Sequence, residues 1–67
     1  MILSDLTTAL EMGYKSGVHA RTAWHPDDLP VALYYAPDHI KRHNELLDAF
    51  EAGYNGALSL EVLIHEY

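Results

Sequence analysis

The sequence contains no cysteine, which excludes disulfide bonds and thiolate zinc sites. No apolar run approaches the roughly 20 residues that cross a membrane, and no charged segment followed by an apolar one opens the chain as a signal peptide would. Positive charge is also scarce, because four Lys and Arg stand against ten Asp and Glu, for a formal net charge of -6. Non-specific affinity for nucleic acid comes mainly from cations at phosphates. These absences predict a cytoplasmic protein that binds neither DNA nor membranes directly.

A length of 67 residues predicts a single domain, 1–67, with a small core. Hydrophobic residues make up 49% of the chain and include five tyrosines, a composition that favours a folded chain over a disordered one. Two helices enclose little interior, so a homodimer is one way to bury these side chains. The acidic surface has two explanations. It keeps a small protein soluble, or it binds a basic partner.

A six-residue motif occurs twice in the chain. Residues 9–14 read Ala-Leu-Glu-Met-Gly-Tyr, and residues 49–54 read Ala-Phe-Glu-Ala-Gly-Tyr. Each copy continues the spacing of small residues at i, i+4 and i+8, which gives Ala9, Gly13 and Gly17 in the first copy and Ala49, Gly53 and Ala57 in the second. On a helix this spacing forms one stripe, and a glycine there costs about 1 kcal/mol relative to alanine. Close backbone approach would offset the cost.

We therefore expect two helices that cross at their small residues in an antiparallel hairpin. The apolar residues that should close the seam beside the crossing are Leu6, Leu10, Phe50 and Tyr54. The first helix should cover about 4–22, with Ser4 as its N-cap. The second should begin at Pro37 or Asp38, where proline and an acid suit the first turn, and run to about residue 54.

Two segments have the pattern of short strands. The connector at 25–37 holds all three prolines, and within it residues 31–35 read Val-Ala-Leu-Tyr-Tyr, which is typical of an extended segment. The pair Asn55-Gly56 is a stop signal for the second helix. Residues 58–65 then alternate apolar and polar side chains with period two, although a continued helix also fits. The predicted fold class is mainly α with minor β.

The string Gly13-Tyr14-x-x-Gly17-x-x-Ala20-Arg21, followed by Ala49-Phe50-x-x-Gly53-Tyr54-x-x-Ala57, resembles the ribosome modulation factor family and its CrpP-like relatives. The resemblance covers roughly residues 9–57 and implies a small helical hairpin. It also implies binding to idle ribosomes near the messenger path, here through the cations Lys15, Arg21, Lys41 and Arg42. Some CrpP-like members are instead described as drug-modifying phosphotransferases. Ribosomal members are basic, whereas this chain is acidic. Its connector has a Trp-His-Pro-Asp-Asp segment at 24–28 in place of the shorter Asn/Cys-Pro-Tyr connector of the family.

His39 and His43 lie at i and i+4 on the predicted second helix, a spacing that lets two imidazoles share a metal. A site would need a third ligand, such as His19, His25 or an acid. The alternative is that both histidines face solvent beside Lys41 and Arg42. There is no cysteine nucleophile, no motif around any serine and no glycine-rich phosphate loop. We therefore expect neither an enzyme nor a cofactor or metal.

Two groups of residues are candidates for binding a partner. In the connector, Trp24, Tyr34 and Tyr35 accompany Asp27 and Asp28, a combination that suits an aromatic anchor with an acidic rim. The alternative is that these aromatics complete a small core.

The second group is an approximate line of acids on the second helix, formed by Glu45, Asp48 and Glu51. Such a line is either an ordinary solvated face or an imitation of a row of phosphates.

Small size, acidity and the lack of catalytic motifs favour a non-catalytic inhibitor. Its expected partner is a basic protein surface, that of a nucleic-acid-binding machine, as for phage anti-CRISPR or anti-restriction proteins. The alternatives are a ribosome-associated modulator and a CrpP-like small phosphotransferase, both implied by the resemblance.

Overall fold

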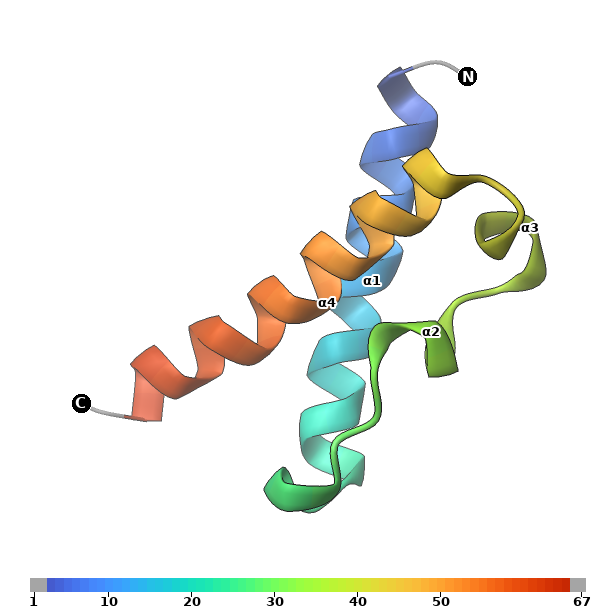
Figure 1. Ribbon diagram of the computed structural model, residues 1–67. Coiled ribbons are helices and arrows are strands. Elements are labelled where there is room, and N and C mark those ends of the chain that lie inside the picture. The colour runs from blue at the N-terminus through green and yellow to red at the C-terminus, as the bar shows by residue number, and fades with distance from the viewer. Residues whose placement is uncertain (1–2, 66–67) are drawn as a thin grey trace.

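The computed structural model describes the backbone of residues 3–65 and the side chains of 4–59. The chain is mostly helical, as expected. In order, the elements are α1 (Leu3–Ala23), a 3-10 turn η1 (Pro26–Asp28), α2 (Ala32–Tyr35), α3 (Asp38–Lys41) and α4 (Asn44–His65) (Figure 1). None of the helices within this described part is long and apolar enough to cross a membrane.

The two long helices, α1 and α4, cross and make most of the tertiary contacts. Both start in the upper part of Figure 1 and descend, and they separate toward their C-terminal ends. They therefore run in the same general direction, and the expected antiparallel direction is wrong. The reason is the connector. An antiparallel pair needs only a loop of about two to five residues, whereas here the chain returns through η1, α2 and α3 to the N-terminal end of α1 before α4 begins.

The segment at 31–35, expected to be a strand, forms the helical turn α2. The N–H of Ala36 donates to the carbonyls of Ala32 and Leu33, at 3.2 and 3.3 Å. Ala32 and Ala36 are both buried. In a strand Tyr34 would share their face, because side chains alternate; the helical turn instead leaves it 63% exposed. The residues that the structure describes contain no strand at all.

The end of the chain also differs from the first expectation. Asn55-Gly56 does not stop the helix, because α4 continues to His65, and no described residue has a positive φ. The strand predicted for 58–65 is wrong, and the alternative of a continued helix is confirmed. The same period of apolar residues fitted both structures, so the sequence could not choose between them.

The ends of the long helices also differ from the predicted ones, but by less. Ser4 lies inside α1 and so is not its N-cap. The predicted second helix is divided in two, because α3 ends at Lys41 and α4 begins at Asn44. At the break, the N–H of His43 donates to the Ile40 carbonyl at 3.2 Å, while the His43 carbonyl accepts from Leu47 in α4 at 2.9 Å. This break lets Ile40 point into the core, where it is 1% exposed.

The core lies between the crossed helices and the connector. Its largest fully buried side chains are Phe50, Tyr54 and Ile40, and the rest of it is built from alanines at 9, 20, 32, 36 and 57. Phe50 and Tyr54 close the seam as expected, but Leu10 is 44% exposed. The connector covers only one side of the crossing, which explains why the two copies of the repeat are buried unequally.

Candidate interaction surfaces

The crossing is close because glycines stand where the backbones meet. A Cβ atom on Gly13 would collide with the carbonyl of Phe50 and would lie 2.8 Å from its carbonyl carbon. A Cβ atom on Gly53 would collide with the carbonyl of Leu10 and lie 2.8 Å from the nitrogen of Tyr14. Phe50 occupies in the second copy of the repeat the position that Leu10 occupies in the first. The two helices therefore meet in register with the repeat.

One turn further along α1 the helices are still in close contact at Gly17, and beyond it a hydrogen bond joins them. A Cβ atom on Gly17 would be 2.7 Å from both the Ala57 Cβ and the Tyr54 carbonyl oxygen. One turn further along α1, Arg21 donates from Nη1 to the carbonyl oxygen of Ala57 at 2.7 Å. Arg21 is thus a structural residue of the crossing.

The connector aromatics form one cluster with the C-terminal part of α1 and the middle of α4. Trp24 Nε1 donates to the hydroxyl of Tyr35 at 2.7 Å. Tyr34 packs edge-on against both rings, with centroid distances of 5.6 Å to Trp24 and 5.1 Å to Tyr35. Tyr35 also contacts His19 at 5.8 Å and Tyr54 at 6.0 Å. Trp24 and Tyr35 are half-buried, so the explanation that they complete the core applies to these two.

Tyr34 is the exposed member of this cluster, and its neighbours along the chain extend the apolar surface. Val31 is 72% exposed and Leu33 48% exposed. The acids Asp27 and Asp28 lie in η1, which begins two residues after Trp24, and both are exposed. The structure therefore brings the three predicted connector aromatics together, and it places the two carboxylates in the short turn that follows Trp24 in the chain. We call the exposed set Tyr34, Asp27 and Asp28 the connector patch.

His25 fixes the turn that carries these acids. Its Nδ1 accepts a hydrogen bond from the N–H of Asp27 at 3.2 Å, and it lies 3.7 Å from the Asp27 carboxylate. An Nδ1 atom that accepts a hydrogen bond carries no proton, so the first contact requires a neutral ring and the second a protonated one. We favour the N-cap bond, because both side chains are largely exposed and an ion pair there contributes little.

The predicted line of acids lies at the other end of the molecule. Glu45 and Asp48 are exposed and Glu51 is partly exposed, all in the first half of α4. No cation of the described residues forms a salt bridge with any of the three. In Figure 1 this part of α4 is at the top, whereas η1 is at the bottom, so the structure does not join the two predicted groups into one site.

Among the residues that the structure describes, Tyr54 has a clearly shifted pKa. Burial raises the pKa of its phenol above 10.0, and the neighbouring Tyr35 adds to the shift. Its hydroxyl donates to the carbonyl oxygen of Pro30 at 2.6 Å, which ties the connector to α4.

The histidine pair does not have the expected geometry. His39 lies in α3, whereas His43 follows the end of that helix, so the two do not share a helical face. Within the described side chains, no three of His, Asp or Glu come together to hold a metal ion.

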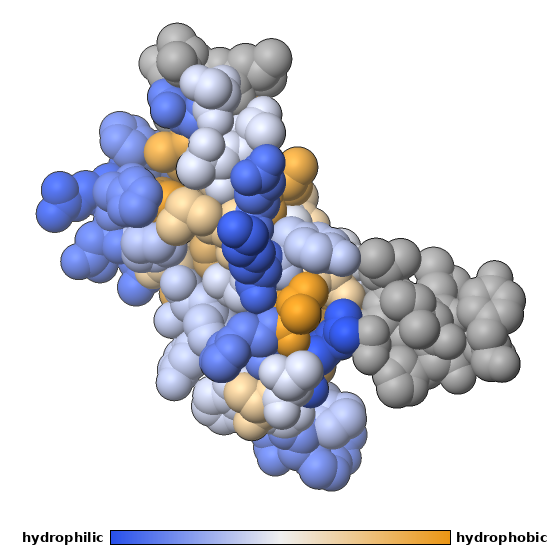
Figure 2. All heavy atoms as spheres, turned by 180° about the vertical axis from the view of Figure 1, so that it is seen from behind, coloured by the Kyte–Doolittle hydropathy of each residue, from blue (hydrophilic) through white to orange (hydrophobic). Residues whose placement is uncertain are grey.

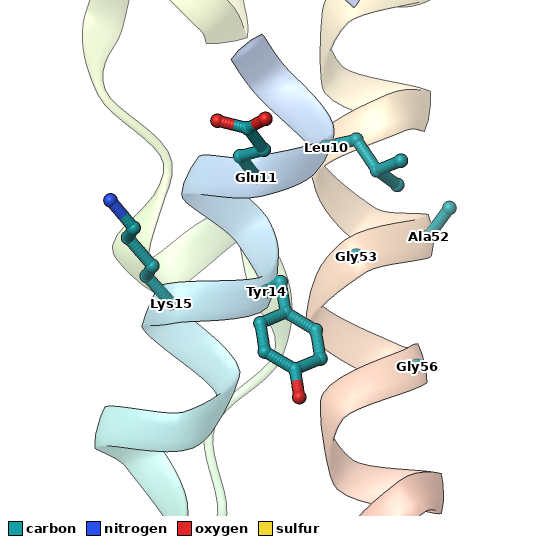
Figure 3. Close-up of a pocket in the computed structure, with 7 residues that line it drawn as sticks. All are labelled: Leu10, Glu11, Tyr14, Lys15, Ala52, Gly53 and Gly56. Atoms are coloured by element: carbon teal, nitrogen blue, oxygen red, sulfur yellow. The ribbon is translucent and has the colours of Figure 1, made fainter. Parts of the chain in front are cut away.

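A groove that the sequence did not reveal lies on the side of the crossing away from the connector. Its volume is about 510 Å³, and Figure 3 shows Leu10 and Tyr14 of α1 leaning toward Ala52, Gly53 and Gly56 of α4. The residue in the sequence that could have indicated this groove is Gly56. A glycine inside a helix lowers stability relative to alanine, yet a Cβ atom at this position would meet nothing within 4 Å, so packing within the chain does not require it.

Comparisons with models of protein families, with curated proteins and with solved structures gave no match for this chain. The resemblance to the ribosome modulation factor family stays a prediction.

Proposed function

We propose that this protein is a non-catalytic inhibitor that docks its acidic surface onto a basic, nucleic-acid-binding protein machine, in the manner of anti-CRISPR or anti-restriction proteins. The observation that carries the proposal is the distribution of charge. The carboxylates of Glu45, Asp48 and Glu51 are at least partly exposed and form no salt bridge within the described residues, and Asp27 and Asp28 are exposed in the turn that follows Trp24. A protein groove that holds nucleic acid attracts such a surface.

The two acidic groups have different roles in this proposal. The line on α4 consists of carboxylates without an exposed aromatic residue among them, so it acts through long-range attraction and raises the association rate. The connector patch combines carboxylates with the ring of Tyr34, which is supported from behind by Trp24 and Tyr35. An aromatic side chain held in this way is typical of a binding hot spot and slows dissociation.

The test uses purified Cas effector complexes and restriction endonucleases with a DNA-cleavage readout. Wild-type protein is expected to block cleavage by one of them at stoichiometric amounts, with inhibition that weakens as salt rises. The triple variant Glu45→Gln, Asp48→Asn, Glu51→Gln should lower the association rate, and Tyr34→Ala should raise the dissociation rate.

Asp38→Asn is the matched control, because Asp38 is an exposed acid on α3 outside both groups. Its inhibition should equal that of the wild type. Equal inhibition by the triple variant, by Tyr34→Ala and by the control would refute the proposed surfaces, and a lack of inhibition across the panel would count against the proposed class of partner.

The ribosome-associated alternative depends on exposed cations. Lys41 and Arg42 are exposed, but Arg21, the arginine of the family motif, is bonded to Ala57 across the helix crossing. A test by Arg21→Glu would confuse binding with folding. Co-sedimentation with ribosomes that is lost on Lys41→Glu with Arg42→Glu, and unaffected by neutralising the acids of α4, would favour this alternative. The phosphotransferase alternative is tested separately, by nucleotide turnover.

A further inference from the structure

The uncovered side of the helix crossing has the features of an interface. The connector packs on one side of α1 and α4, and the groove opens on the other (Figure 3). Beside it, three apolar side chains of α1 follow one another at i, i+4 and i+8. Leu10 is 44% exposed, Tyr14 42% and Val18 37%. Seen from behind, the molecule shows separate hydrophobic patches beside a column of hydrophilic side chains (Figure 2).

No contact within a single copy of the chain requires a glycine at position 56. Gly13, Gly17 and Gly53 are each required by the close crossing, whereas a Cβ atom on Gly56 would have open space around it. A glycine inside a helix costs about 1 kcal/mol relative to alanine. Close approach by a side chain or helix from outside the chain would offset that cost, as the crossing does for the other three.

The charges at the rim of the groove indicate which occupant fits. Glu11 and Lys15 line it from α1, on the flank turned away from α4 in Figure 3, and they carry opposite charges. If two copies of α1 lie antiparallel with Tyr14 near the twofold axis, Glu11 of each copy faces Lys15 of the other. A two-fold interface is self-complementary in this way. A strongly basic partner would instead be drawn to the acidic groups elsewhere on the molecule.

We propose that a second copy of this chain occupies the groove, in an isologous dimer. The ridge of Leu10, Tyr14 and Val18 on each copy packs along the same ridge of the other, and a side chain of that ridge enters the groove above Gly53 and Gly56. The dimer does not depend on the proposed inhibitory function, because neither the connector patch nor the acids of α4 line the groove.

Sedimentation equilibrium from micromolar to millimolar concentration tests the dimer directly. Wild-type protein is expected to pass from monomer to dimer across this range. A wild type that stays monomeric throughout would overturn the proposal.

Gly56→Leu separates this interface from folding. The Cβ atom of the new side chain meets nothing within 4 Å, the rest of it extends into the open groove, and leucine raises helix propensity, so the melting temperature should hold or rise while the dimer is lost. Asn55→Leu is the matched control, because Asn55 is the adjacent exposed residue and does not line the groove. It should dimerise like the wild type. If Gly56→Leu dimerises as strongly as the control, the groove is not the interface.

A mixing experiment tests the two-fold pairing of charges. Glu11→Lys places two lysines on each rim, and Lys15→Glu places two glutamates there. Each variant alone should dimerise at least tenfold more weakly than the wild type, and an equimolar mixture should form heterodimers. No gain on mixing would contradict the antiparallel arrangement of the two ridges.

Discussion

Gly13 lies directly against the backbone carbonyl of Phe50, so that no Cβ atom fits between α1 and α4 at this point. Gly53 has the same relationship to Leu10. The repeat therefore explains the close crossing, because each copy supplies a glycine against which the backbone of the other copy packs. The crossing places the connector on one side and leaves a groove on the other.

The first prediction concerns the glycines at the crossing. Gly13→Ala should destabilise the fold, because the contacted atoms belong to the backbone and cannot move aside without separating the helices. Overpacking costs about 1 to 3 kcal/mol, more than the helix propensity that alanine gains. Urea denaturation followed by circular dichroism measures the change in the free energy of unfolding.

Gly56→Ala is the matched control on α4. Here the new Cβ meets nothing, so the free energy of unfolding of the monomer should rise by about 0.5 to 1 kcal/mol. Dilute protein should be used, so that association does not contribute. Equal effects of Gly13→Ala and Gly56→Ala would mean that the helices do not approach closely at Gly13.

The second prediction concerns alkaline pH. Because the pKa of Tyr54 is raised in the folded state, its proton stabilises the fold below pH 10.0, and this contribution is lost as the pH rises through the raised pKa. Stability should therefore fall above about pH 10, and Tyr54→Phe should show a shallower fall. Thermal melts from pH 8 to 11 give the comparison. The same steepness in both proteins would contradict the assignment to Tyr54.

The third prediction concerns Arg21. Arg21→Met keeps the aliphatic stem but removes the bond to the Ala57 carbonyl, and it should lower stability by about 1 kcal/mol. Lys15→Met removes a cation from the same helix without such a bond and serves as the control in the same unfolding assay. An unchanged stability in Arg21→Met would show that the bond across the crossing is dispensable.

The fourth prediction concerns the aromatic cluster. Tyr35→Phe removes the acceptor of the Trp24 indole N–H, so the indole should turn toward water and its fluorescence maximum should shift to longer wavelength. Tyr34→Phe removes a hydroxyl for which the described residues offer no bonded partner and should leave the spectrum nearly unchanged. Identical shifts in the two variants would contradict the specific pairing of Trp24 with Tyr35.

The sequence predicted the crossing but not its direction. Small residues at i, i+4 and i+8 allow close approach of helices that run either way, so Gly13 and Gly53 alone cannot distinguish parallel from antiparallel. The direction depends on how far the connector carries the chain before α4 begins. That depends on the turns at α2 and α3; the composition of 31–35 wrongly predicted a strand in place of α2, and the sequence predicted α3 and α4 as one continuous helix.

The candidate site was predictable in part. Trp24, Tyr34 and Tyr35 were expected together and lie together, because two prolines bound a short segment that has to pack near the end of α1. The separation of this cluster from Glu45 could not be read from sequence, since it follows from the direction of α4. The sequence does not reveal the groove, because Asn55-Gly56 has the pattern of a helix stop, whereas α4 continues through it.

The distance between the start of α4 and each end of α1 tests the parallel crossing most directly. The chain has no cysteine, so spin labels can be attached through Glu45→Cys paired with either Thr8→Cys or Thr22→Cys. Thr8 and Leu46 line one small cavity, whereas Thr22 lies about 20 Å further along α1 at 1.5 Å per residue. The account predicts a clearly shorter electron–electron distance for the pair with Thr8. A shorter distance for the pair with Thr22 would show an antiparallel pair and contradict the fold on which both proposed surfaces depend.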